Sequence, residues 1–285
     1  MDQPIDTGDD PAWIYQEDFR RPRFVGDPLH HREIISQLRE ILVLARGHRQ
    51  KRWGFAIVRT SYGPGSDEQM QCALALIRRT AQVFTDTEAI SVKHILEEHK
   101  SSQPFELADL SLEFDTRPNQ EILSRFENDV LEDAALEDAS VATVREYFAD
   151  WIATKDGPSN TGDIRFISCV ILDAETLAQL ATVPGDFPET GTTGFRSPYW
   201  VKVVEVKPQP EEAFRVYLFG EFGLAQYWFD RNHNRRSAIE LTHNKDPKCP
   251  GIRYFGYLPT NVGYLPSDAG LLPYTQLPES VEILQ

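Results

Sequence analysis

The fold of this chain is decided by one stretch of its sequence, Trp53-Gly54-Phe55-Ala56-Ile57-Val58-Arg59-Thr60. The stretch is apolar on both faces until its last two residues, which is typical of a strand covered on both sides and central to its sheet. A turn at 61–65 follows, and Ser66 and Gln69 then form an S-x-x-Q pattern that opens a helix. The stretch therefore predicts a strand–turn–helix unit at the centre of the fold.

Further units predict the rest of the sheet. A second apolar run, 164–172, ends at Asp173, which is placed to cap a following helix. The runs 199–206 and 214–219 have the spacing of an antiparallel hairpin with a longer loop, and a short helix is expected over 223–230. This order predicts an α+β fold, with a mixed β-sheet and helices mainly on one face.

The middle of the chain is expected to be an acidic helical insertion within a single α+β domain. The domain covers 1–255 and the insertion about 101–156, where 14 acids stand against 4 bases. Apolar residues from Ile122 to Val130 predict one helical stripe in it, and Ser140 is expected to cap a further helix.

The C-terminal segment 256–285 predicts an extended arm rich in Pro, Gly and Tyr. Gly-Tyr-Leu-Pro at 256–259 recurs at 263–266, and a degenerate copy follows at 270–273. Prolines at this density exclude a helix and favour extended segments. Two interpretations stay open, namely an arm laid over the domain and a docking strap for a protein partner at 256–273.

Composition favours a soluble, cytoplasmic protein. No apolar run approaches the ~18 to 20 residues that span a bilayer, so no membrane segment is expected. The acidic N-terminus carries no apolar segment of a secretory signal. The three cysteines are odd in number and widely spaced, which is not a disulfide framework.

Charge is unevenly distributed along the chain, whose formal net charge is −15. The stretch 20–52 has 9 bases against 3 acids, and 231–253 has 6 against 2. These basic stretches are either solvated surface or contacts for an RNA such as tRNA.

Candidate site residues follow the first strand. Ligands of open sheets bind beyond the carboxyl ends of the strands, which points to Arg59, Thr60, Ser61 and Tyr62. Arg59 shares a face with the apolar side chains of its strand, so its guanidinium is expected where that face ends. It offers a fork for a carboxylate or phosphate of a substrate, or else pairs with an acid such as Glu205.

A second candidate lies after another predicted strand. Glu221 stands between two aromatic residues in Phe219-Gly220-Glu221-Phe222-Gly223. Such surroundings raise the pKa of a carboxyl group and suit it to general acid or base catalysis. The candidate catalytic residues are therefore Glu221, Ser61 and Tyr62, and the candidate substrate-binding residues are Arg59, Thr60 and Glu205.

No metal or cofactor is expected. His94 and His99 are five residues apart, so they diverge on a helix and do not match H-E-x-x-H. His243 and Cys249 share a loop but lack two further ligands with zinc spacing. Neither the phosphate-loop pattern nor G-x-S-x-G occurs in the chain.

Two resemblances rest on the first unit. The strand 53–60 with its turn, and the later strand Trp200–Glu205, look like those of a large group of uncharacterised filamentous-fungal proteins. That likeness implies a cytosolic fungal protein of specialised metabolism. A strand that ends in a serine-bearing turn before a helix also resembles the opening of the cyclodipeptide synthases, which use aminoacyl-tRNA, and Ser61 matches the position of their nucleophile.

Three alternative functions are predicted from these observations. The first is a small-molecule enzyme or binding protein for a polar or anionic substrate. The second is a tRNA-dependent enzyme like the cyclodipeptide synthases, and the third a non-catalytic protein-interaction module.

Overall fold

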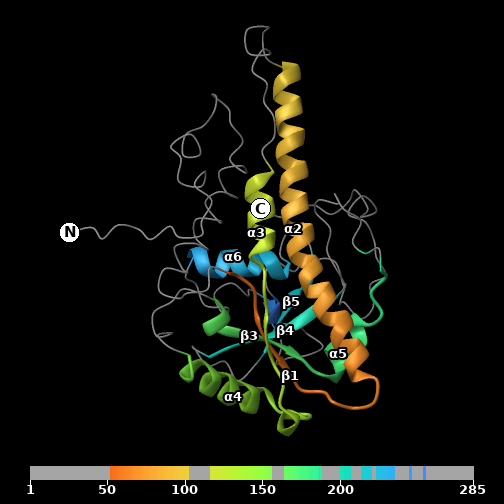
Figure 1. Ribbon diagram of the computed structural model, residues 1–285, viewed down its shortest axis with the longest axis vertical. Coiled ribbons are helices and arrows are strands. Elements are labelled where there is room, and N and C mark those ends of the chain that lie inside the picture. The colour runs from red at the N-terminus through yellow and green to blue at the C-terminus, as the bar shows by residue number, and fades with distance from the viewer. Residues whose placement is uncertain are drawn as a thin grey trace, which may run out of the picture.

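The protein is described from a computed structural model of the 285-residue chain (Figure 1). The residues that the structure describes are 52–102, 116–155, 164–185, 187, 199–206, 213–219, 223–234, 244–245 and 253–254. Side chains are described only up to residue 86 in the first range, and not at 230, 232–234, 244–245 or 253–254. The expected arm 256–285, the basic stretch up to residue 51 and Glu221 lie outside them. Within the described residues, no helix is both long and apolar enough to cross a membrane.

A mixed sheet organises the described chain, in the order β2-β1-β3-β4-β5-β7-β6. Its five longer strands are β1 (Ala56–Arg59), β2 (Asp129–Leu131), β3 (Ser168–Leu172), β4 (Trp200–Glu205) and β5 (Phe214–Tyr217). Two-residue strands β6 (Asn244–Lys245) and β7 (Arg253–Tyr254) extend it. β1 runs parallel to both β2 and β3, and β4 runs antiparallel to β3 and β5. The expected hairpin and mixed sheet are confirmed. The strand expected to be central is an interior strand with a partner on each side, but it lies next to the edge strand β2.

Helices cover the two faces unequally, as Figure 1 shows. The helices are α2 (Ser66–Ser102), α3 (Arg117–Ser124), α4 (Val141–Ala153), α5 (Ala174–Leu180) and α6 (Leu224–Asn234). α4 packs on one face, whereas side chains of the other four join the core on the opposite face. This confirms an α+β fold with helices mainly on one face.

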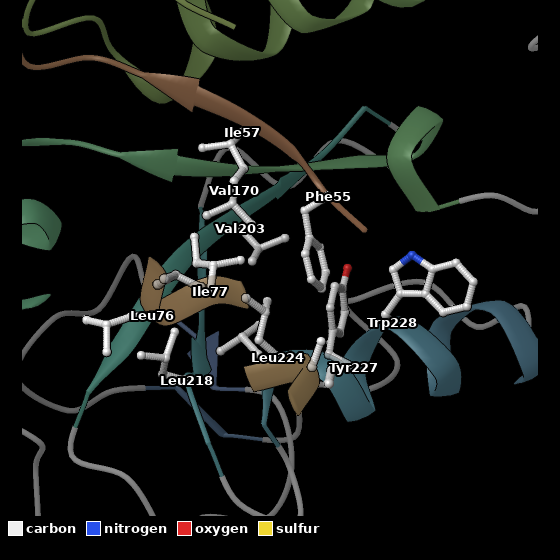
Figure 2. Packing of buried hydrophobic residues seen from close by; sticks show 14 of the residues in the cluster. Phe55, Ile57, Leu76, Ile77, Val170, Val203, Leu218, Leu224, Tyr227 and Trp228 are labelled. Carbon is white, nitrogen blue, oxygen red and sulfur yellow. The ribbon is translucent and has the colours of Figure 1, made fainter. Parts of the chain in front are cut away.

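The larger core lies beneath α2, α5 and α6. Ile57, Val170 and Val203 of the sheet point toward Ile77 of α2 (Figure 2). Phe55 points toward Tyr227 of α6, and Leu224 and Trp228 of α6 belong to the same layer. Each of these side chains is almost fully buried, so this apolar layer is the main hydrophobic stabilisation of the fold.

The smaller core lies between α4 and the opposite face of the sheet. Ala56 and Val58 of β1 and Cys169 and Ile171 of β3 alternate with the residues of the larger core and contact this second cluster. Phe148 of α4 covers them and is fully buried. Burial on both faces explains why the deciding stretch is apolar at nearly every position.

The first strand is shorter than the sequence predicts. Trp53 forms only an isolated bridge to Phe126, and regular β1 begins at Ala56. Gly54 separates them with a φ of +147°, and a Cβ there would lie 2.2 Å from the carbonyl oxygen of Glu127. Glycine therefore permits the close approach of the two chains. Trp53 is fully buried, and its indole N–H donates to the Ile122 carbonyl at 2.6 Å.

Two expectations about local structure are wrong. The stripe from Ile122 to Val130 is not one helix, because α3 ends at Ser124 and residues 129–131 form edge strand β2 beside β1. The S-x-x-Q capping pattern does not form its box either. α2 begins at Ser66 itself, and the Ser66 hydroxyl accepts a hydrogen bond from Arg59 instead.

Other helix starts are confirmed. The Ser140 hydroxyl accepts from the Thr143 backbone N–H at 3.2 Å, and the Asp173 carboxylate accepts from that of Thr176 at 2.9 Å. These are N-caps of α4 and α5. The run 164–172 starts with a 3₁₀ turn at Ile164–Phe166 rather than as a strand.

Candidate functional site

At the carboxyl ends of β1 and β2, the connections that follow the two strands leave toward opposite faces of the sheet. The chain leaves β1 toward α2 on one face, whereas it leaves β2 toward α4 on the other. Open sheets bind ligands beyond the carboxyl ends of strands whose connections part in this way. Residues 60–65 and 132–140 follow the two strand ends, so we name these two loops the carboxyl-end loops.

Arg59 holds the ends of β1 and β2 and the start of α2 together. Its side chain is 7% exposed, and its Nε donates to the Ser61 carbonyl at 2.7 Å. One terminal nitrogen lies 2.9 Å from a carboxylate oxygen of Glu132, and the other donates to Ser66 and Asp67 at 2.7 and 2.5 Å. Burial opposes the charged form, but bonds to the two carboxylates raise the pKa of Arg59. The guanidinium thus joins β1, the start of α2 and the end of β2.

Tyr62 links the two carboxyl-end loops. Its backbone N–H donates to the Glu137 carboxylate at 2.6 Å, and its hydroxyl accepts from the Asp133 N–H at 2.7 Å. The hydroxyl also donates to the Arg59 carbonyl at 3.1 Å. Desolvation raises the pKa of Tyr62 despite the opposing effects of the Asp133 N–H and the Arg59 charge. The phenol is therefore a neutral hydrogen-bonding group near pH 7.

The main chain of Thr60 and Ser61 belongs to the same network. The Thr60 N–H donates to Leu172 at 3.1 Å, and its carbonyl accepts from the Asp138 N–H at 3.0 Å. Asp138 has a φ of 53°, in the left-handed region that aspartate tolerates. Thr60 and Ser61 are both buried. The structure thus brings together four of the six residues expected at the site, Arg59 to Tyr62.

Carboxylates dominate the surface around Tyr62. Asp67 and Glu132 contact Arg59 with side chains 85% and 51% exposed. Asp133, Glu137 and Asp138 of the second carboxyl-end loop are also exposed. We name the five the acidic rim. These five acids come together because β2 pairs with β1. The sequence pattern predicted a helix at β2, so it did not predict this cluster of acids.

Glu205 lies away from the carboxyl-end loops. It pairs in the sheet with Ser168, at the end of β3 opposite to the Leu172 end that borders Arg59. Its side chain is 0% exposed, and Arg231 of α6 donates to it at 2.7 Å. The expected pairing of Arg59 with Glu205 is therefore wrong, since each residue has a different partner.

A further charged cluster surrounds Lys202 on the α4 face of β4. Its ammonium lies 2.5 Å from Asp173 and 2.6 Å from Glu175, and Arg215 contacts Glu175 at 3.3 Å. The Arg215 guanidinium also stacks 3.8 Å from the ring centre of Trp200. Each cation has a carboxylate partner here, which makes the cluster a link between β4, β5 and the start of α5.

Metal and base candidates find little support in the described part of the chain. No group of three potential metal ligands occurs among its residues. None of the seven histidines lies where side chains are described, and neither do Glu221 and Cys249. The candidate roles of Glu221, as acid or base, and of Ser61, as nucleophile, stay predictions.

Comparison with known proteins adds no relative, because no family model, no curated protein and no solved structure matches this chain.

Proposed function

We propose that this protein binds a small polar molecule between the carboxyl-end loops and recognises a positively charged group on it. One observation carries the proposal: at the divergence of β1 and β2, the acidic rim surrounds a half-buried aromatic ring. Carboxylates gathered at the ends of two strands attract cations electrostatically, and the Tyr62 ring already holds one cation, the Arg59 guanidinium, 4.5 Å from its centre.

The charge of the ligand differs from the anionic substrate that the sequence suggested. Arg59 is the cation between the carboxyl-end loops, but Asp67 and Glu132 already contact both of its terminal nitrogens. An anion would have to displace a carboxylate and then lie beside the rest of the rim. A ligand with an ammonium or guanidinium group displaces no carboxylate and is attracted by the acidic rim, so the Arg59 contacts stay intact.

Recognition is better supported than a reaction. The raised pKa of Tyr62 disfavours the phenolate that a general base or nucleophile would need. Ser61 is buried and contributes its carbonyl to Arg59. The residues at hand bind and orient a charged group, and any catalytic group comes from elsewhere in the chain.

Neither of the other expected functions gains a supporting contact. Arg52 pairs with Glu127 and Asp129, and Arg231 pairs with buried Glu205. Each basic stretch thus has one member engaged within the protein rather than offered to tRNA. The expected protein-docking segment 256–273 lies outside the described residues.

The proposal is tested by titrating the ¹⁵N-labelled protein with spermidine and, separately, with succinate. Spermidine is expected to shift the backbone signals of Tyr62 and its neighbours, and succinate is not. Glu132→Gln and Glu137→Gln keep the side-chain shape and should each weaken spermidine about 5-fold or more, in line with losing one close charge. Glu146→Gln, which removes an exposed acid of α4, is the matched control.

Two results would overturn this function. One is a spermidine titration that leaves the Tyr62 signals in place at low salt. The other is an equal loss in Glu146→Gln, since it would mean that spermidine responds to overall charge rather than to the acidic rim.

A further inference from the structure

The strand β2 forms one edge of the sheet. It is the terminal strand in the order of strands, with β1 as its partner. Val130 at its centre is 42% exposed, the one large apolar side chain of the described residues that is exposed. An edge strand of this kind presents backbone groups that can pair with a further strand.

The register fixes which groups face outward. The Asp129 N–H donates to the Phe55 carbonyl at 2.9 Å, so Asp129 directs its backbone groups toward β1. Neighbouring residues of a strand direct theirs to opposite sides. The N–H and C=O of Val130 therefore point away from β1, toward the side on which the described residues form no further strand.

Side chains along this edge alternate between the two faces of the sheet. Val130 pairs with Ile57 of β1 and shares its face, and Glu132 lies two residues further on the same face. Glu132 is 51% exposed and already reaches Arg59 on that face. An apolar side chain and a carboxylate thus stand two positions apart along one side of the edge.

We propose that the β2 edge binds an extended peptide segment with an apolar residue beside Val130 and a lysine or arginine beside Glu132. Backbone bonds to Val130 would supply affinity, and the two side-chain positions would supply specificity, as in other cases of strand addition. The inference rests partly on the proposed function, because the acidic rim begins at Glu132.

Charge selects this occupant over a second copy of the chain. The edge and its ends carry Glu127, Asp129, Glu132 and Asp133, against which Arg52, Arg59 and Arg165 are the contacting cations. A second β2 would bring the same excess of carboxylates to the interface, which is unfavourable. A basic strand complements them.

The test uses the ¹⁵N-labelled full chain and the acetylated, amidated peptide lysine–threonine–valine–threonine–lysine, which reads the same in both strand directions. The Val130 amide signal is expected to shift and its hydrogen exchange to slow. Two control peptides replace both lysines with glutamate, or the valine with proline, which lacks an N–H. Each is expected to bind at least 5-fold more weakly.

Variants separate edge pairing from general attraction. Val130→Lys replaces an exposed side chain, so folding is retained, and it should abolish peptide binding. Ala181→Lys adds the same charge at the exposed end of α5 and should change peptide binding less than 2-fold. The proposal is overturned if both variants bind alike, if the proline peptide binds as well, or if the Val130 signal depends on protein concentration alone, which would indicate a second copy.

Failure of this inference is distinguishable from failure of the proposed function. Spermidine binding at Tyr62 without a peptide effect at Val130 would overturn the peptide site and leave the small-molecule site standing. Peptide pairing at Val130 with no response to spermidine would support the edge and overturn the small-molecule site.

Discussion

The guanidinium of Arg59 lies 4.5 Å from the ring centre of Tyr62, and the Tyr62 hydroxyl donates back to the Arg59 carbonyl at 3.1 Å. The two residues therefore clamp the turn that leaves β1. Through Glu132 and Asp133 the clamp also reaches the end of β2. One buried cation thus fixes both loops that line the candidate site.

Arg59→Met should loosen both carboxyl-end loops. The change removes the donors to Ser61, Ser66, Asp67 and Glu132. Since the two acids are largely exposed, water replaces their contacts, and we expect a loss of about 2 kcal/mol in the free energy of unfolding. Urea unfolding measures it. Arg59→Lys should recover only part, because an ammonium lacks the fork. A stability equal to the wild type in Arg59→Met would contradict the clamp.

Gly54→Ala should destabilise the fold by at least about 2 kcal/mol, through the unfavourable φ and the contact of a Cβ with Glu127. Gly63→Ala is the matched control, because a Cβ at Gly63 would meet no atom within 4 Å. Its effect should stay within about 0.5 kcal/mol. Thermal unfolding of both variants checks the pair, and equal effects would show that close packing at Gly54 is not the cause.

Much of the fold follows from local sequence patterns. The stretch from Trp53 to Thr60 predicts an interior strand because both of its faces are buried, and the caps at Ser140 and Asp173 predict helix starts by their own side chains. Strand β2 is not predicted by such local patterns. Of its three residues Asp129 is intermediate, Val130 exposed and Leu131 buried, and they take their conformation from pairing with β1. That pairing is a long-range contact that no local pattern records.

The candidate site was predictable only in part for the same reason. The position of Arg59 to Tyr62 follows from the end of the first strand. The acids that surround them come from Asp67 on α2 and from the loop after β2, so their approach depends on a pairing between residues more than 70 positions apart. The predicted pairing of Arg59 with Glu205 failed because strand alternation does not show which buried acid contacts which cation.

Arg231→Met should destabilise the protein strongly, by about 3 kcal/mol or more, because it leaves the Glu205 carboxylate buried without this cation. Glu205→Gln in the same chain should restore part of that loss, since the remaining amide carries no charge. A double-mutant cycle measured by urea unfolding gives the coupling. Additive effects of the two substitutions would contradict an ion pair that matters for stability.

Acid stability should depend on Asp173. Burial opposes its ionised form, but the hydrogen bond from Lys202 and the Thr176 N–H together hold the pKa of Asp173 below its ordinary value of 3.8. A depressed pKa in the folded state stabilises the protein above the ordinary value, and this contribution disappears as pH falls through the folded pKa. Asp173→Asn keeps a capping side chain for α5 but removes the charge, so its unfolding free energy should fall less steeply than that of the wild type below about pH 4.

The matched control for this pH dependence is Asp150→Asn, a change at an exposed position of α4. Both variants remove one carboxylate, so their overall charges are equal and only the Lys202 contact differs. Urea unfolding between about pH 2.5 and 6 should give the Asp150 variant the same slope as the wild type and the Asp173 variant a shallower one. If the two variants gave the same slope, the acid dependence would reflect total charge, and the Lys202–Asp173 contact would not contribute to it.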